Sequence, residues 1–248
     1  MKHIILFLFF AATTLPTMAQ ELTVTKYLNK NGDSTGKENA FTYSVVTYTD
    51  STKLVYTTKN YTIQGQLKSE ISYRDSGKIW QYDGNYISNH ENGKPKIKGR
   101  YIKNKLHGEL STWYANGQIK RKDEYVLDSL ISGRCYTATG QDTTWFPYHI
   151  MFKYGNGLNE LYNFFGRNIR YPKEAQSMGL EGIVHIQFFV EKDGTLSHEK
   201  IKHSVSYHID KEALRVFKAL PPRWQPALID GEPQRGYGIL PVSFKLGR

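Results

Sequence analysis

The residues best suited to metal or acid–base chemistry lie between positions 185 and 208, where four histidines occur. His198 and His203 are five residues apart with Glu199 between them. A zinc-binding helix needs two histidines four residues apart, so that both face the same side. This segment instead alternates as a strand does, and a metal site remains the weaker interpretation beside solvent-facing strand histidines. We predict no metal site.

Other catalytic signatures are missing from the sequence. It contains no Gly-x-Ser-x-Gly nucleophile turn, no phosphate-binding Gly-Lys-Ser/Thr loop and no Cys-x-x-Cys pair. The single Cys135 has no partner for an intramolecular disulfide and no visible neighbour that would activate it as a nucleophile. The sequence therefore predicts a protein that is not an enzyme and has no cofactor.

The net charge of +10 limits the class of partner. The excess of Lys and Arg is spread over both halves of the chain. A diffuse excess favours solubility or affinity for anionic surfaces, so we expect no nucleic-acid site.

The first nineteen residues have the pattern of a secretory signal peptide. Lys2 and His3 precede a short apolar run from Ile4 to Ala12, and small residues lead to a cleavage site after Ala19. We therefore expect export to the periplasm. The alternative is an uncleaved anchor in the inner membrane through residues 4–15.

Residues 20–145 have the composition of many short antiparallel strands, rich in Tyr, Thr, Val and Ile. Turn signals recur 24 and then 23 residues apart, at Asn92-Gly93, Asn116-Gly117 and Thr139-Gly140. A fixed period indicates hairpins that each bury a face against their neighbours. From Gly99 to Gly117 the sequence resembles a MORN-type repeat of the YwqK-like variant, and the resemblance covers about residues 60–145.

The cations of this region follow a regular pattern as well. Lys94, Lys96, Lys98 and Arg100 alternate, which places them on one face of a strand. A solvated face that discourages edge aggregation is favoured over an anionic-ligand site. The nearby Tyr and Trp residues favour cross-strand packing over carbohydrate stacking.

Residues 146–157 are expected to form a linker into a second domain, residues 158–248. Leu158, Leu161 and Phe165 have helical spacing. A strand follows from Ile183 to Val190, Asp193-Gly194 predicts a hairpin, and Thr195 to Val205 is its partner strand. Asp210 can cap a second helix, and Tyr237 to Leu246 supplies a last strand.

This order resembles the C-terminal domain of TonB proteins over residues 158–246. The matching elements include Arg170-Tyr171-Pro172, Asp193-Gly194, Trp224-Gln225-Pro226 and Leu240-Pro241-Val242-Ser243-Phe244. The resemblance implies an α+β chain: an N-terminal β-hairpin (MORN-like) repeat region and then a small domain with a three-stranded antiparallel sheet and two helices.

The resemblance also implies a function, because TonB-like domains lend a sheet edge to a short extended segment of an outer-membrane TonB-dependent receptor. The residues carried over as partner-binding are Arg170, Tyr171, Pro172, Tyr237, Gly238, Ile239, Leu240, Pro241, Val242, Ser243 and Phe244. For Tyr171 and Pro172, a purely structural role at the end of the first helix is an equal alternative.

The sequence departs from an energy transducer in two respects: it has no convincing anchor and no long Pro-rich linker. An ExbB/ExbD-like motor is a partner only if the N-terminal segment is uncleaved. Another envelope protein or a second copy of the chain can also occupy the edge. The alternative function is a periplasmic structural or regulatory scaffold whose MORN-like repeats bind a protein or a membrane.

Overall fold

The computed structural model describes residues 21–50, 52–75, 77 and 79–247. The proposed signal peptide, residues 1–19, therefore lies outside the described residues, as does the alternative anchor. No helix in the described part of the chain is long and apolar enough to cross a membrane. The chain divides into two compact units, Met1–Trp145 and Phe146–Arg248.

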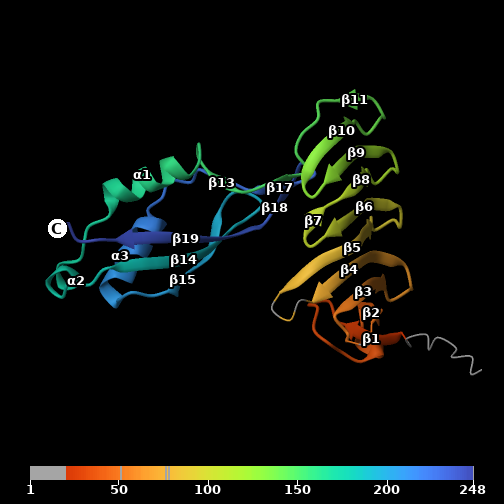
Figure 1. The fold of residues 1–248 in the computed structure, drawn as a ribbon, viewed down its shortest axis with the longest axis horizontal. Helices are drawn as coiled ribbons and strands as arrows, with labels where there is room; N and C mark the ends of the chain where they lie inside the picture. Colours follow the sequence, from red (N-terminus) through yellow and green to blue (C-terminus); the bar gives the residue numbers. More distant parts are fainter. Residues whose placement is uncertain (1–20, 51, 76, 78, 248) are drawn as a thin grey trace, which may run out of the picture. The chain divides into compact units, whose positions relative to one another are not determined.

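The N-terminal unit is one antiparallel sheet (Figure 1). Its described strands are β1 Leu22–Leu28, β2 Thr42–Tyr48, β3 Val55–Thr62, β4 Leu67–Asp75, β5 Trp80–Asn89, β6 Pro95–Ile102, β7 Lys105–Leu106, β8 Gly108–Trp113, β9 Ile119–Val126, β10 Ser129–Tyr136 and β11 Asp142–Thr143. A short 3-10 helix, Lys37–Asn39, follows β1. Nearly every strand pairs with the next one along the chain, and β7 pairs with β6 beside the main order. The region predicted as separate stacked hairpins is thus a single large sheet, because consecutive hairpins share ladders of backbone hydrogen bonds.

The period of this sheet has a physical basis in its turns. The Asn92 side chain donates to the carbonyl of Ala115 at 2.7 Å, and the Asn116 side chain donates to the carbonyl of Ala138 at 3.0 Å. The glycine after each asparagine has a positive φ, 81° at Gly93 and 93° at Gly117, which a side chain would strain. Each of these turns is therefore bonded to the next one, which accounts for their regular spacing.

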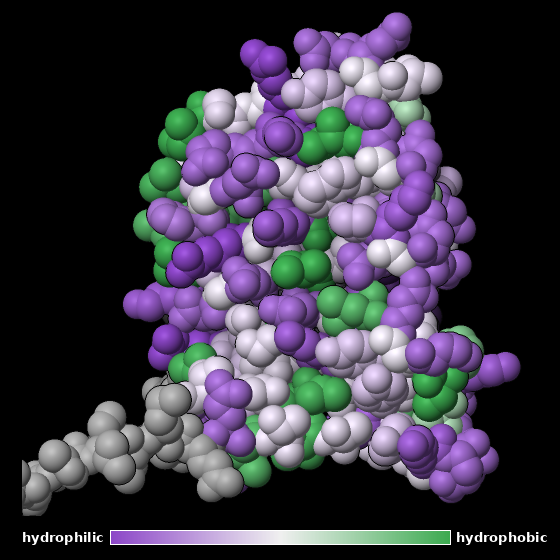
Figure 2. Space-filling model, turned by 90° about the vertical axis from the view of Figure 1, so that its right-hand side faces the viewer, coloured by the Kyte–Doolittle hydropathy of each residue, from purple (hydrophilic) through white to green (hydrophobic). Residues whose placement is uncertain are grey.

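Tyrosines stack across the strands of the same sheet. Neighbouring rings in the row Tyr48, Tyr56, Tyr73, Tyr82 and Tyr101 have centroids 5.2 to 5.6 Å apart. These rings pack on one another across the ladder. The side of the unit seen in Figure 2 is mainly hydrophilic, with small, separate apolar patches.

The C-terminal unit, Phe146–Arg248, has three helices in the described residues, α1 Leu158–Asn168, α2 Lys173–Ser177 and α3 Tyr207–Lys218. A three-stranded antiparallel sheet has the order β15-β14-β19, with β14 Gly182–Val190, β15 Leu196–His203 and β19 Gly236–Phe244. Shorter strands form two small sheets, from β12 His149–Ile150, β13 Lys153–Tyr154, β16 Trp224–Gln225, β17 Ala227–Ile229 and β18 Glu232–Gln234. The sheet is as predicted, whereas the helix α2 is additional.

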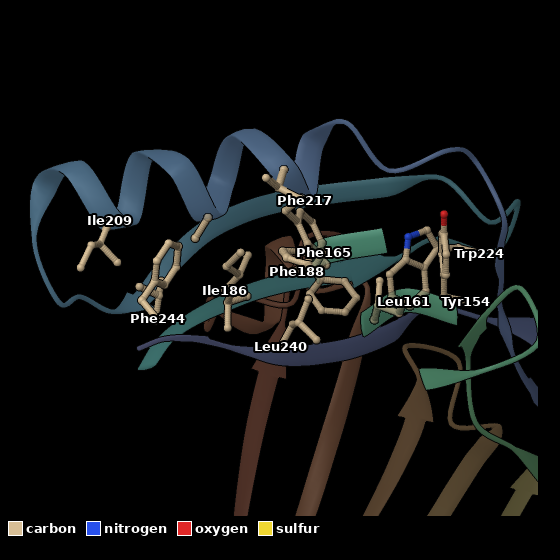
Figure 3. Packing of buried hydrophobic residues seen from close by; sticks show 14 of the residues in the cluster. Tyr154, Leu161, Phe165, Ile186, Phe188, Ile209, Phe217, Trp224, Leu240 and Phe244 are labelled. Atoms are coloured by element: carbon tan, nitrogen blue, oxygen red, sulfur yellow. The ribbon is translucent and has the colours of Figure 1, made fainter. Parts of the chain in front are cut away.

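The core of this unit lies between the sheet and its helices. Alternate residues of β14 are buried: Val184, Ile186, Phe188 and Val190. From the helices come Leu161 and Phe165 of α1 and Ile209, Ala213, Val216 and Phe217 of α3. Figure 3 shows Ile186, Phe188 and Leu240 pointing from the strands toward the helical layer. Burial of this one face orders the sheet, because each large apolar side chain contributes about 1.5–3 kcal/mol when removed from water.

Two expectations about this unit are corrected. Residues 146–157 contain β12 and β13, which pair with β17 and β16, so they are part of the unit and not a linker. Apolar packing holds this segment against the unit, because Tyr154 is buried and its ring lies 5.2 Å from that of Trp224. The helix α3 begins at Tyr207 with Ser206 as its N-cap, whereas Asp210 accepts from the amide of Val205.

The role of residues 146–157 is testable with two fragments. We expect residues 146–248 to unfold cooperatively alone, and residues 158–248 to melt at a temperature lower by about 10 °C or more, because the shorter fragment loses the half-buried Phe152 and the buried Tyr154 side chains. Thermal circular dichroism measures both. Equal midpoints would contradict the assignment of these residues to the unit.

The tyrosine row of the N-terminal unit makes its stability depend on alkaline pH. Burial raises the pKa of Tyr56 and of Tyr101 from 10.0 to about 12. The folded state therefore binds protons that the unfolded state releases first. The resulting stability is complete below pH 10 and is lost between pH 10 and about 12. Denaturant unfolding of the 20–145 fragment across this range measures it, and a pH-independent free energy of unfolding would contradict it.

Candidate functional site

The strand β19 lies at an edge of the C-terminal sheet. It pairs along all nine residues with β14, in an unshifted register from Gly182 opposite Phe244 to Val190 opposite Gly236. In the described residues, the sheet order ends at β19, which leaves the outer side of this strand without a partner strand. A strand in this position presents a row of free backbone donors and acceptors.

The two faces of β19 alternate strictly. The even-numbered residues from Gly236 to Phe244 are buried, and the odd-numbered residues Tyr237, Ile239, Pro241 and Ser243 are exposed. Pro241 has no N–H to donate to β14, and a proline inside a strand is tolerated where that position faces outward. The direction of the backbone N–H and C=O groups also alternates from residue to residue along a strand. The groups of Tyr237, Ile239 and Ser243 therefore point away from β14, as the Pro241 position does.

The opposite edge of the sheet, β15, is a poor template for another strand. It contains Glu199, Lys200 and Lys202, and its pairing with β14 is shifted at two places. His198 at one of these shifts has a φ of 58°, which bends the strand. Charges and bulges are the features that protect an edge from pairing. In contrast, β19 has the sequence GYGILPVSF without a charged residue and without a shift.

Tight packing holds β19 in place on its buried side. A Cβ added to Gly238 would lie 2.5 Å from the Phe188 ring and 2.9 Å from the Phe152 ring. Glycine is required here because two aromatic rings approach the strand backbone closely. Leu240, Val242 and Phe244 continue the buried row into the main core. The edge is therefore rigid before any partner arrives.

A groove runs along this edge beside α1. Its volume is about 520 Å³, and it is lined by Tyr162, Phe165 and Gly166 of α1, the C-cap residue Ile169 of that helix, Ile183 of β14, and Leu240, Pro241, Val242 and Ser243 of β19. None of the lining side chains is charged. The groove puts the unpaired edge of β19 within reach of an apolar wall.

The segment Arg170-Tyr171-Pro172 has internal contacts. The Tyr171 hydroxyl donates to the carbonyl of Leu180, and its ring lies 5.7 Å from the Phe244 ring. The amide of Arg170 donates to Glu212 at 2.7 Å, and Pro172 is the N-cap residue of α2. The structure thus brings Tyr171 to the end of β19, where it packs against the strand, while the Arg170 side chain is exposed.

Glu212 connects this segment to α3. The pKa of its carboxyl is lowered from 4.5, first by the hydrogen bonds from Arg215 and then by the amide of Arg170, against the effect of burial. The Arg215 guanidinium donates to both oxygens at 2.7 Å and also to the carbonyl of Asn168 at the end of α1. These bonds fix the chain between α1 and α2.

The histidines that could suggest metal chemistry are dispersed. The His185 and His203 rings lie 5.5 Å apart on neighbouring strands, whereas His198 lies against Phe189 and Arg235. Within the part of the chain that the structure describes, no three His, Cys, Asp or Glu side chains are grouped as metal ligands.

In the N-terminal unit, the predicted basic face is partly used by the fold. Lys96, Lys98 and Arg100 are exposed on one face of β6. Lys94 instead donates to the carbonyl of Asn116 at 2.8 Å, which ties one turn to the next. Only three of the four cations therefore share the solvated strand face.

The sequence pattern alone does not identify the α1 wall of the groove. Tyr162 lies between the core positions Leu161 and Phe165, whereas Ile169 follows the last residue of α1. Only proximity in the fold places both beside β19. One signal was available: Gly166 lies inside a helix, where glycine costs roughly 1 kcal/mol relative to alanine and therefore calls for a local reason.

Two family models match parts of the chain. Residues 167–246 match the family model described as Gram-negative bacterial TonB protein C-terminal, and residues 82–103 and 106–126 match the MORN repeat variant. The resemblance to both families is confirmed, and the C-terminal unit carries a TonB-like domain. The solution structure of the Helicobacter pylori TonB C-terminal domain is 21% identical, with 36% of this chain and 80% of that chain covered and a TM-score of 0.29. No curated protein matches the chain.

The direction of the β19 backbone groups is testable with two proline variants. We expect Ile239→Pro to change the free energy of unfolding by about 1 kcal/mol or less, because no bond to β14 is lost. Leu240→Pro removes a donor that faces β14 and should cost ~3 kcal/mol or more beyond the effect of Leu240→Ala. Urea unfolding of all three variants measures this. The reverse order would mean that Ile239 faces β14.

Proposed function

We propose that this is an exported cell-envelope protein that works by binding, not by catalysis. Its TonB-like domain takes up an extended segment of an outer-membrane TonB-dependent receptor as a fourth strand beside β19. One observation carries the proposal: of the two edges of the sheet, β15 is charged and bulged, whereas β19 is regular, uncharged and without a neighbour in the described residues.

The energetics of strand addition fit this edge. Backbone hydrogen bonds each contribute only about 0.5–1.5 kcal/mol net, so several must form together. The outward groups of Tyr237, Ile239 and Ser243 and the carbonyl of Pro241 lie in one row. Because β14 and the core already hold the strand in place, binding costs only the conformational entropy that the partner segment loses.

Location and further partners follow from the same proposal. Residues 1–19 direct export to the periplasm, where the receptor's inner side is accessible. Participation of an ExbB/ExbD-like motor requires that residues 4–15 remain as an anchor. The family match over residues 167–246 supports the class of partner, and the transported substrate is the receptor's property.

A photo-cross-linking amino acid at position 239 tests the proposal in living cells. The Ile239 side chain is 39% exposed, so the replacement leaves the core intact. We expect the cross-linked peptide, identified by mass spectrometry, to come from a periplasmic segment of an outer-membrane transporter. The same amino acid at Lys200, exposed on β15, is the matched control and should not capture that segment.

Two results would contradict the proposal. Equal capture of the transporter from positions 239 and 200 would mean that β19 is not the binding edge. Capture of only other envelope proteins, above all from probes on β6 near Lys98, would instead favour the scaffold function of the MORN-like unit.

A further inference from the structure

We propose that the groove between α1 and β19 selects the side chains of the added strand, and requires apolar residues at two positions that alternate with unrestricted ones. The inference rests on strand addition at β19 and concerns which segments that edge accepts. The ligand class is an extended peptide with small or branched apolar side chains at positions i and i+2.

The selection follows from the geometry of a pleated sheet. Side chains directly opposite each other on neighbouring strands point to the same face. Leu240 and Val242 point into the core, toward the face where α1 lies, and both line the groove. The two residues of an added strand that lie opposite them therefore point toward Tyr162, Gly166 and Ile169.

The chemistry of the lining decides what fits there. Apart from the Tyr162 hydroxyl and the Ser243 hydroxyl, the lining side chains carry no polar group. A charged or strongly polar side chain would lose its water without gaining a partner, which is unfavourable. An apolar side chain instead covers Ile169 and Phe165. The alternate residues of the added strand lie on the face of Ile239 and Pro241, which are exposed, so that side sets little constraint.

Gly166 supplies the space for these side chains. It is exposed in the third turn of α1, and an added Cβ would meet no heavy atom within 4 Å. Neither a tight turn nor a close backbone approach therefore requires glycine at this position. Its effect is to widen the groove at the point where the helix faces Leu240 and Val242, which a side chain at 166 would narrow.

The test uses the full chain and two labelled peptides long enough to span β19, flanked by lysines for solubility. In the first, Val alternates with Thr; in the second, Ser replaces each Val. Fluorescence anisotropy should give a Kd for the Val peptide lower by about tenfold or more than that for the Ser peptide, since each buried apolar side chain adds favourable burial.

Three variants distinguish the contribution of the groove to peptide binding from that of the β19 edge. Gly166→Leu fills the space and should raise the Kd of the Val peptide by about tenfold, with little effect on the Ser peptide. Gly166→Ala adds one methyl group at the same point and should raise this Kd by a smaller factor, about two- to threefold. Both substitutions improve helix propensity, so their melting temperatures should equal or exceed that of wild type. Ile239→Pro should abolish binding of both peptides.

The outcomes are distinguishable. If Gly166→Leu binds the Val peptide as tightly as wild type while Ile239→Pro does not bind, the groove does not select and strand addition stands. If Ile239→Pro binds like wild type, or if neither peptide binds, both proposals fail. A wild-type dimer in sedimentation that Ile239→Pro dissociates, without peptide binding, would identify a second copy as the occupant and overturn the peptide assignment.

Discussion

The need of backbone groups for hydrogen-bond partners dominates the C-terminal unit. A three-stranded sheet satisfies both sides of its central strand only, so each outer strand has one free row of N–H and C=O groups. Here β14 is central, and the chain treats its two neighbours differently. β15 is interrupted by shifts and charged residues, whereas β19 keeps nine paired residues in register. The unit thus has one edge protected from pairing and one edge suited to it.

The rest of the unit holds that edge rigid. Leu240, Val242 and Phe244 anchor β19 in the core, and Phe152 packs against its glycines from a segment that precedes the first helix. Tyr171 supports the end of the strand, and Glu212 fixes the turn that follows α1. A rigid template lowers the entropic cost of binding, because only the partner segment has to become ordered. The same packing leaves α1 beside the free edge, which gives the edge its apolar wall.

In the N-terminal unit, the repetition of strands gives most backbone N–H and C=O groups a partner on a neighbouring strand. Nearly every strand pairs with the next one along the chain, and the turns are bonded to each other through Asn92, Asn116 and Lys94. A row of stacked tyrosines runs across the same strands. Stability of this kind is distributed over nearest-neighbour contacts, which makes such a unit tolerant of changes in strand number. Its surface carries the exposed cations of β6 and no large apolar patch in the view of Figure 2.

Local chemistry allowed the sequence alone to determine much of this protein. Alternation from Ile183 to Val190 predicted the central strand, the 24- and 23-residue spacing of the Asn-Gly and Thr-Gly turns predicted the repeat, and the joint order of motifs predicted the TonB-like domain. These signals are short-range, and each depends on side-chain periodicity or on turn conformation. What required the tertiary structure depends on distant partners: β12 and β13 pair with strands that lie 70 to 80 residues later, from Tyr154 opposite Trp224 to His149 opposite Ile229, so residues 146–157 looked like a linker. The same is true of the groove, because Gly166 and Leu240 line it together only when α1 packs beside β19, and no local pattern encodes that arrangement.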